Sequence, residues 1–158
     1  MPMLFIGMPV FNGGKFIAGA MDSLIAQTFT DWTLLISDNC STDNTRDICE
    51  SYCSKDARIQ YIKQDKNIGA IDNFKYLLEQ ANAPFFMWAA ADDLWEKNFI
   101  SVCIKGLQTI PDNGWAFTNI INIDTYGHTV REYPSFSRYT HADPVLNVTG
   151  FILDPEYL

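Results

Sequence analysis

Apolar runs typical of β-strands alternate with segments of helical periodicity, and this alternation constrains the fold more than any other feature of the sequence. The strand-like runs occupy residues 3–8, 32–37, 59–63 and 85–89. Apolar side chains at the spacing of one helix face lie between them, over residues 15–27, through Ile48, Cys49 and Tyr52, and through Ile71, Phe74, Leu77, Leu78 and Ala81. The predicted order is therefore βαβαβαβ, which is typical of an α/β protein with a mostly parallel sheet flanked by helices.

The pattern changes after residue 93. The sequence predicts a helix over residues 96–107, a strand over 115–124, a turn at Thr125-Tyr126-Gly127 and a return strand over 128–133. Beyond Pro134 there is no periodicity, and the sequence stops at Leu158 without a closing helix. We expect a single domain over residues 1–158 that is incomplete at its C-terminus.

Composition and charge exclude several classes of protein. The 158 residues include 19 acidic and 11 basic side chains, for a formal net charge of -8, and no cluster of Lys and Arg of the kind that holds nucleic acid. No stretch approaches the roughly 18 apolar residues of a membrane span. The apolar run at residues 3–11 lacks the basic region and the cleavage site of a signal peptide. We expect a cytoplasmic protein that binds no nucleic acid.

Polar residues follow each of the four strand-like runs. Because the carboxyl ends of parallel strands share one edge of a sheet, these loops are expected to lie together, where open α/β sheets bind their ligands. The loops comprise residues 9–14, 37–39, 66–69 and 90–93. None of them contains a phosphate-binding P-loop or a G-x-G-x-x-G motif, which argues against a P-loop kinase and against a dinucleotide-dependent dehydrogenase.

Two adjacent carboxylates, Asp92 and Asp93, follow the fourth strand-like run, which we expect to be a buried strand. Paired carboxylates at the edge of a sheet favour a hard divalent cation bound together with the phosphates of a ligand. The alternative is that one of the pair caps the next helix. Asp38, at the end of the second strand, also has two interpretations: a ligand contact, or a residue that caps a helix or forms an Asx turn.

Five motifs follow one another within residues 4–100. They are Met8-Pro9-Val10-Phe11-Asn12, Gln27-Thr28-Phe29-Thr30-Asp31-Trp32, Ile36-Ser37-Asp38-Asn39-Cys40-Ser41-Thr42-Asp43-Asn44-Thr45, Asn67-Ile68-Gly69-Ala70-Ile71-Asp72-Asn73 and Ala90-Ala91-Asp92-Asp93-Leu94-Trp95. As a set they resemble family 2 glycosyltransferases of the GT-A fold. The resemblance implies a GT-A-like, Rossmann-like fold with a nucleotide-binding half over residues 1–95 and a partial acceptor-side half over 96–158.

The resemblance also implies an activity. Members of the family transfer a sugar, with inversion, from a nucleoside diphosphate donor to an acceptor hydroxyl, usually with a divalent cation. For this chain we expect a UDP-sugar as the donor, Mg or Mn as the cofactor, and a glycan or a lipid-linked sugar as the acceptor.

Roles for individual residues follow from the same resemblance. The expected nucleotide-sugar-binding residues are Pro9, Val10, Phe11, Asn12, Asp38, Asn67, Gly69, Asn73 and Asp92. Residues 9–11 would lie along the nucleoside, and the Asp38 carboxylate would accept an N–H of uracil. Asp92 and Asp93 would hold the metal, which allows an acidic protein to bind a pyrophosphate.

Two positions depart from the family pattern, and one role has no candidate. Ala90 stands where the first acid of the DXD motif is expected, and Asp72 stands where relatives often have Arg. An inverting transferase needs a base to take the proton of the acceptor, and the family supplies it downstream of the region covered here. We therefore assign no catalytic base and nominate none of the late acids Asp143, Asp154 and Glu156.

Alternatives to a complete transferase stay open. One is a module that binds a nucleotide or nucleotide sugar without turnover, which the short chain and Ala90 favour. Another is a sugar-phosphate nucleotidyltransferase, although only Gly13-Gly14-Lys15 resembles its Gly-rich, basic first loop. A homodimer formed through exposed apolar surface, and peripheral association with the inner face of the membrane, also stay open.

Overall fold

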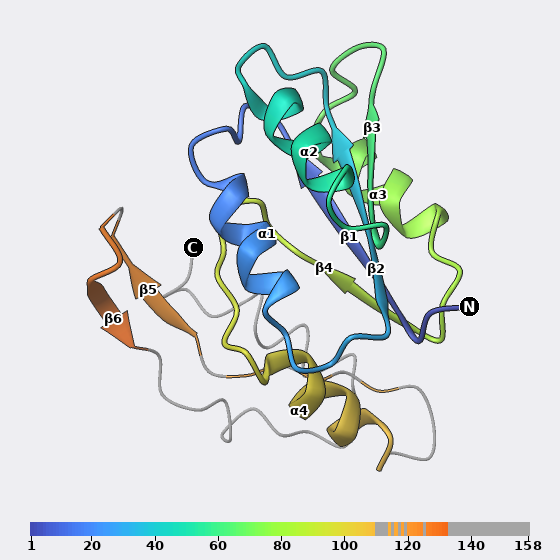
Figure 1. Ribbon diagram of the computed structural model, residues 1–158, viewed down its shortest axis with the longest axis vertical. Coiled ribbons are helices and arrows are strands. Elements are labelled where there is room, and N and C mark those ends of the chain that lie inside the picture. The colour runs from blue at the N-terminus through green and yellow to red at the C-terminus, as the bar shows by residue number, and fades with distance from the viewer. Residues whose placement is uncertain (110–113, 115, 117, 119, 125, 133–158) are drawn as a thin grey trace. The chain divides into compact units, whose positions relative to one another are not determined.

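The computed structural model of the chain divides into two compact units, Met1–Ile100 and Ser101–Leu158. It describes residues 1–109, 114, 116, 118, 120–124 and 126–132. The elements, drawn in Figure 1, are β1 (Leu4–Val10), α1 (Ile17–Ile25), β2 (Trp32–Asp38), α2 (Thr45–Cys53), β3 (Ile59–Lys63), α3 (Ala70–Glu79), β4 (Phe85–Trp88), α4 (Phe99–Leu107), β5 (Ile121–Ile123) and β6 (Thr129–Glu132). The predicted order βαβαβαβ is confirmed. The predicted organisation as one domain with halves at 1–95 and 96–158 stays a prediction.

A four-stranded parallel sheet in the order β3-β2-β1-β4 is the framework of the first unit. β1 pairs with β2 along its whole length, so Val10 and Asp38 lie opposite each other where the two strands end. β4 pairs with the other side of β1, and β3 pairs with the free side of β2. Because all three pairings are parallel, the carboxyl ends of the four strands share one edge, as predicted.

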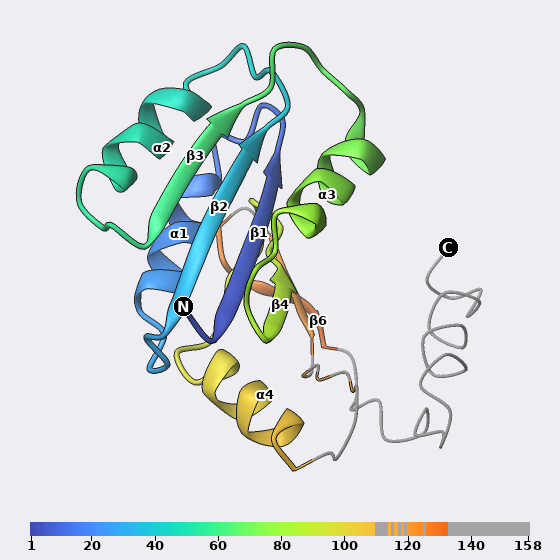
Figure 2. The ribbon, with the colours of Figure 1, turned by 90° about the vertical axis from the view of Figure 1, so that its right-hand side faces the viewer.

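Helices cover both faces of this sheet. Figure 2 shows α1 and α2 on one face and α3 on the other. The core between these layers includes the fully buried side chains of Ile6, Met8, Ile17, Met21, Leu24, Leu34, Ile36 and Leu77. In the described part of the chain, no helix is both long enough and apolar enough to cross a membrane.

β4 and α3 are more exposed than the sequence indicates. The sequence predicts a buried fourth strand, and this is wrong for the described residues, because β4 is an edge strand and Trp88 at its end is 42% exposed. On α3 the buried positions are Asn73 and Leu77, whereas Ile71 and Phe74 of the predicted apolar face are exposed. The predicted homodimer through exposed apolar surface stays a prediction.

The C-terminal part of the described chain is a helix followed by a hairpin. The helix predicted over residues 96–107 is α4, which begins later, at Phe99. Within the strand predicted over 115–124, parts of which lie outside the described residues, Ile121–Ile123 form β5, which pairs with the antiparallel strand β6. The return strand predicted over 128–133 is confirmed as β6. The acids Asp143, Asp154 and Glu156 lie outside the described residues.

Candidate functional site

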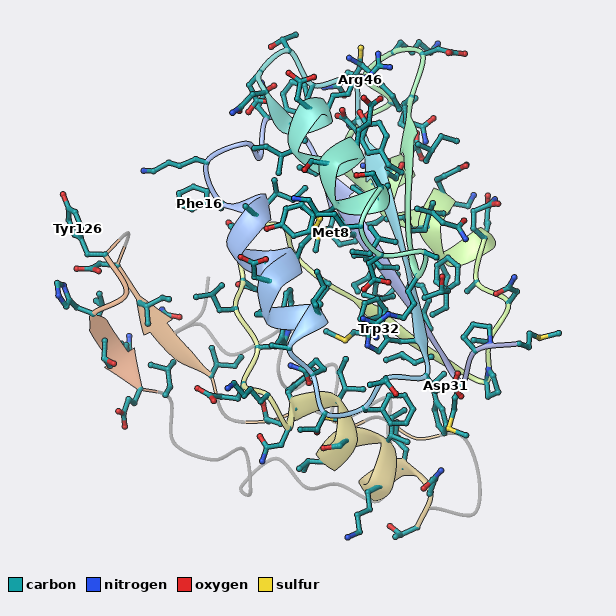
Figure 3. The ribbon with its side chains drawn as sticks, in the orientation of Figure 1. Met8, Phe16, Asp31, Trp32, Arg46 and Tyr126 are labelled. Atoms are coloured by element: carbon teal, nitrogen blue, oxygen red, sulfur yellow. The ribbon has the colours of Figure 1, made fainter. Side chains whose placement is uncertain are left out.

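The carboxyl edge of the sheet gathers the loops that the sequence marks for ligand binding. We call residues 11–16, 39–44 and 64–69, which follow β1, β2 and β3, the polar cradle, and residues 90–93, which follow β4, the acidic turn. In Figure 3, Arg46 lies at this end of the sheet and Asp31, before β2, lies at the opposite end. A Cβ built on Gly13 lies 3.6 Å from the Cβ of Ala91, so the polar cradle and the acidic turn are in contact.

Asp38, at the end of β2, is fully buried and holds the loop that follows it. Its Oδ1 accepts a hydrogen bond from the Ser41 N–H at 2.8 Å, and its Oδ2 accepts one from the Tyr61 hydroxyl at 2.6 Å. Burial, together with the bond to Asp38, raises the pKa of the Tyr61 hydroxyl, which therefore stays a donor. Both carboxylate oxygens of Asp38 are thus bonded inside the protein, so a contact between this carboxylate and a nucleobase requires these hydrogen bonds to break. The base contact of Asp38 stays a prediction.

Asn39 ties the loop after β2 to the loop after β3. Its Oδ1 accepts the Ile68 N–H at 2.7 Å, and its Nδ2 donates to Asn67 Oδ1 at 3.0 Å. The same Asn67 oxygen accepts the Gly69 N–H at 2.9 Å. Gly69 has a φ of 87°, in the left-handed region that glycine adopts without strain, and α3 begins at the next residue. Of the predicted site residues, Asn67 is thus held by Asn39, and Gly69 is held by Asn67.

Asn12 docks the loop after β1 onto the loop after β2. Its N–H donates to Ser41 Oγ at 2.8 Å, and its Oδ1 accepts the Thr42 N–H at 2.9 Å. Its backbone has a φ of 52°, a conformation that Asn tolerates better than most residues. Together with Asn39, this residue makes the three loops of the polar cradle one bonded unit.

Other atoms approach Gly13 and Gly14 closely, and the approach is harder to relieve at Gly13, because Val10 is buried whereas Asn44 is exposed. A Cβ on Gly13 would lie 2.5 Å from Val10 Cγ2, and a Cβ on Gly14 would lie 2.0 Å from Asn44 Oδ1. The Gly14 N–H also donates to Asp43 Oδ2 at 2.9 Å. These glycines therefore let the first loop pack against β1 and against the second loop.

Asn73 joins α3 to the end of β2 through buried hydrogen bonds. Its Nδ2 donates to the Ser37 carbonyl at 2.9 Å, and its Oδ1 accepts the Ser37 hydroxyl at 2.6 Å. Gln64 Nε2 donates to the same Ser37 hydroxyl oxygen at 3.0 Å. With 2% of its surface exposed, Asn73 supports the polar cradle from inside the fold. A direct contact of Asn73 with a donor stays a prediction.

Phe11 and Phe16 are the aromatic side chains that the polar cradle exposes. The Lys15 ammonium lies over the Phe16 ring, 4.9 Å from its centroid. Phe11 follows β1 directly and is 51% exposed, next to the buried Val10. An exposed ring beside fixed polar loops can stack on a nucleobase. The contact of Phe11 with a nucleoside stays a prediction.

The carboxylates of the acidic turn have no partner among the residues that the structure describes. Asp92 and Asp93 are both exposed, and none of the described residues donates a hydrogen bond to either carboxylate. Partial loss of hydration and, second, the neighbouring Asp92 carboxylate raise the pKa of Asp93. Since α4 begins only at Phe99, neither acid caps it, and the helix-cap alternative is wrong.

This donor set fits a hard divalent cation such as Mg or Mn. These ions are commonly held by one or two carboxylates together with phosphate oxygens and water. The described residues contain no group of three or more His, Cys, Asp or Glu side chains that could hold a metal alone. Asp92 and Asp93 are therefore the residues that would hold the ion, with its other ligands coming from the substrate and from water.

Sequence reasoning missed the residues that shape the polar cradle, among them Asn39, Ser41 and Tyr61. The first two stand in a run of Asn, Ser, Thr and Asp, a composition that signals side-chain bonds to the backbone of a loop. No local signal marks Tyr61. Its bond to Asp38 depends on the pairing of β3 with β2, in which Asp38 lies opposite Lys63.

The fold and this edge define the class of protein: a mostly parallel sheet flanked by helices, as in the GT-A glycosyltransferases. The chain belongs to glycosyl transferase family 2, whose model matches residues 5–153. This assignment confirms the family resemblance read from the five motifs.

Two relatives illustrate the membership. A Bacillus subtilis (strain 168) protein, the glycosyltransferase TuaG, whose name assigns it to teichuronic acid biosynthesis, is 30% identical over 117 residues, which cover 74% of this chain and 45% of TuaG. WfgD of Escherichia coli, a UDP-Glc:alpha-D-GlcNAc-diphosphoundecaprenol beta-1,3-glucosyltransferase, is 29% identical over 103 residues, 65% of this chain and 40% of WfgD. The chain thus spans less than half the length of either relative.

Solved structures share the fold. Residues 1–349 of S. aureus TarS in complex with UDP superimpose with a TM-score of 0.63 at 21% identity, over 76% of this chain and 41% of that TarS fragment. The mannosyltransferase PcManGT of Pyrobaculum calidifontis, in complex with GDP-Man and Mn2+, gives a TM-score of 0.62 at 18% identity, over 67% of this chain and 32% of PcManGT. These similarities confirm the predicted GT-A-like fold.

Proposed function

We propose that the chain is the nucleotide-sugar-binding part of an inverting glycosyltransferase whose donor is a UDP-sugar. The observation that carries this proposal is the contrast at the sheet edge. The carboxylates of Asp92 and Asp93 have no partner among the described residues, and their turn contacts, through Ala91, a polar cradle whose own groups are bonded to one another. Such an edge offers a fixed wall for a nucleoside and free carboxylate oxygens for a metal-bound diphosphate. TarS, which shares the fold, was solved with UDP, and the name of WfgD specifies UDP-Glc.

In this proposal the nucleoside lies along residues 9–12, with its base against the Phe11 ring. Asn67 and Gly69 form the adjacent wall of the donor site, and Asp38 keeps the loop after β2 in place. Asp92 and Asp93 would hold Mg or Mn. When bound, such an ion neutralises charge on the diphosphate leaving group. The Mn2+ in the PcManGT complex supports this choice of cation.

Inverting transfer places the acceptor oxygen on the face of the sugar opposite the diphosphate. The new bond from this oxygen to the anomeric carbon forms as the bond to the phosphate oxygen breaks, and a base takes the proton of the acceptor hydroxyl. We assign no residue of the chain to that base. For the acceptor we propose a glycan or a lipid-linked sugar, in keeping with the diphosphoundecaprenol-linked GlcNAc in the name of WfgD.

Calorimetric titration with UDP, with and without Mn2+, tests the donor site. We expect UDP to bind and Mn2+ to tighten its binding, because a cation held by the acidic turn screens the repulsion between the diphosphate and a chain of net charge -8. Absence of UDP binding at millimolar concentration in both titrations would contradict the proposal. Release of UDP from a UDP-sugar, measured in parallel, separates a transferase from a module that binds the donor without turnover.

A further inference from the structure

Gln27 is a buried polar side chain in one of the five family motifs, and the proposed function gives it no role. It follows the C-terminus of α1 and is 3% exposed. Its Nε2 donates to the Glu96 carbonyl at 2.8 Å and lies 3.4 Å from the Trp95 carbonyl, and its Oε1 accepts the Ile100 N–H at 3.0 Å. One side chain therefore bonds three backbone positions of the segment that follows the acidic turn.

These bonds hold one end of a short segment, residues 89–95, that is attached to the rest of the fold at both ends. At its start, the buried Ala89 donates its N–H to the Gly7 carbonyl at 2.9 Å and so continues the pairing of β4 with β1. At its far end, the Trp95 N–H donates to Ser23 Oγ at 3.3 Å, next to the bonds from Gln27. The acidic turn lies between these two anchors. Within it, the only backbone hydrogen bond found among the described residues runs from the Asp93 N–H to the Ala90 carbonyl, at 3.4 Å.

The bond to Ile100 has a further consequence. The first N–H groups of a helix lack partners within the helix, and Gln27 supplies one to α4 from a distant point in the sequence. Because the side chain is buried, no water can replace these bonds when the side chain is removed. Gln27 therefore holds the path of the chain on leaving the acidic turn, together with Ser23 Oγ and the Thr28 N–H, which donates to the Lys97 carbonyl at 2.8 Å.

We propose that Gln27 is a positioning residue for the metal-holding carboxylates Asp92 and Asp93. It bonds neither the acids nor the donor. It fixes the backbone from which the acids project, so that both can reach one cation without a further loss of chain entropy. Removal of a group that orients a metal ligand without contacting the metal typically lowers metal affinity by about 10- to 100-fold. The inference rests on the proposed function, since it presumes that the acidic turn holds the ion.

The test compares Gln27→Met, which keeps the volume and removes the bonds, with the parent protein. UDP affinity is measured with and without Mn2+, and amide hydrogen exchange is followed over residues 90–98 and 38–45. We expect the Mn2+ enhancement of UDP affinity to fall by roughly tenfold, with metal-free affinity unchanged. Exchange should become faster over residues 90–98 and stay as in the parent over 38–45. Gln60→Met, on the exposed face of β3, is the matched control and should behave like the parent.

Ser23→Ala is measured beside it and stays informative if Gln27→Met folds poorly. Of the bonds to the segment after the acidic turn it removes only the one from Trp95, together with the bond from Ser23 Oγ to the Ala20 carbonyl within α1. We expect the same changes on a smaller scale. The inference is overturned if these variants keep the parent's Mn2+ enhancement, or if affinity falls equally with and without the metal, as a general loss of structure would produce. A parent protein without any Mn2+ enhancement would instead overturn the metal site itself, and this outcome is recognised before any variant is made.

Discussion

The polar cradle and the acidic turn lie side by side at one edge of the sheet, yet they treat their polar groups in opposite ways. In the polar cradle, Asn12 and Asn39 form hydrogen bonds to the other loops. Asp38, at the end of β2 just before the second loop, accepts hydrogen bonds from Ser41 of that loop and from Tyr61 on β3. In the acidic turn, the carboxylates of Asp92 and Asp93 have no partner among the residues that the structure describes. The hydrogen bonds of the polar cradle fix the shape of its loops, whereas the carboxylates of the acidic turn stay available to bind a cation.

This difference separates residues that hold a site from residues that contact its ligand. A buried acceptor already bonded inside the protein gains little by exchanging that bond for one to a ligand, because folding and binding each contribute only the net difference between two bonds. An exposed carboxylate beside a like charge gains more from a cation. Substitutions in the polar cradle should therefore lower stability, and substitutions in the acidic turn should lower metal-dependent binding.

The largest expected effect is the loss of stability in Asp38→Ala. The substitution leaves the Ser41 N–H and the Tyr61 hydroxyl without their acceptor, which costs roughly 3 kcal/mol of unfolding free energy in total. Urea unfolding followed by circular dichroism measures it. Tyr61→Phe removes one of the two bonds and should cost about 1 kcal/mol. If Asp38→Ala is as stable as the parent and binds UDP less tightly, Asp38 contacts the ligand and the comparison fails.

A smaller loss is expected for Gly13→Ala. The new Cβ would lie 2.5 Å from Val10 Cγ2, and Val10 is a buried, β-branched residue that cannot rotate away. Overpacking of this kind costs about 2 kcal/mol, visible as a lower thermal midpoint. Gly106→Ala on α4 is the matched control. Its Cβ meets nothing within 4 Å, so the change should be neutral or stabilising, and an equal loss in both variants would contradict the packing argument.

Phe11→Ala should behave unlike its neighbours in the polar cradle. Its ring is exposed, so the unfolding free energy should change by less than about 0.5 kcal/mol. Loss of base stacking should weaken UDP binding by roughly 1 kcal/mol, or about fivefold, with and without Mn2+ alike. The two titrations described above provide the measurement. If Phe11→Ala binds UDP as tightly as the parent does, the base of UDP does not stack on Phe11.

The smallest effects concern the pH dependence of stability, and they have opposite signs in the two regions. The Thr45 hydroxyl, followed by the N–H groups of Gly14 and Thr45, lowers the pKa of Asp43 from 3.8, so Asp43 stabilises the fold above that pH and the contribution is lost as pH falls through its folded pKa. The raised pKa of Asp93 has the opposite effect on stability. Its contribution is present below pH 3.8 and is lost as the pH rises through the pKa of Asp93 in the folded protein.

Asp43→Asn should therefore be less stable than the parent at pH 7, and metal-free Asp93→Asn should be more stable. Both differences should be on the order of a few tenths of a kcal/mol, because the side chains are exposed, and both should vanish toward pH 3. Thermal unfolding from pH 3 to pH 7 in the presence of EDTA measures them. Differences of the same sign in the two variants would contradict the contrast between the regions.

The sequence predicted the sheet and the edge of the site well, because both follow from periodicity. The runs at 32–37 and 59–63 became β2 and β3, and parallel pairing then brought four loops to one edge. Burial was predicted less well. Trp88 has an apolar side chain in an apolar run, but its exposure depends on the position of β4 in the strand order, which periodicity does not encode.

The sequence also did not predict which acids hold the loops in place and which stay free to contact a ligand. Asp38 and Asp92 look alike in the sequence, since each is an acid at the end of an apolar run. They differ because the pairing of β2 with β3 brings Tyr61 to Asp38, whereas no such donor meets the acidic turn among the described residues. That distinction depends on tertiary contacts and becomes visible only in the structure.

The most direct test of this account is the effect of Mn2+ on UDP affinity in a protein carrying Asp92→Asn and Asp93→Asn together. The ratio of the UDP dissociation constants without and with Mn2+ should fall from the parent's value to about one, because both carboxylates that would hold the cation are gone. Asp31→Asn, an exposed acid at the opposite end of the sheet, should keep the parent's ratio. A double variant that keeps the parent's ratio would contradict the assignment of the acidic turn as the metal-holding part of the site.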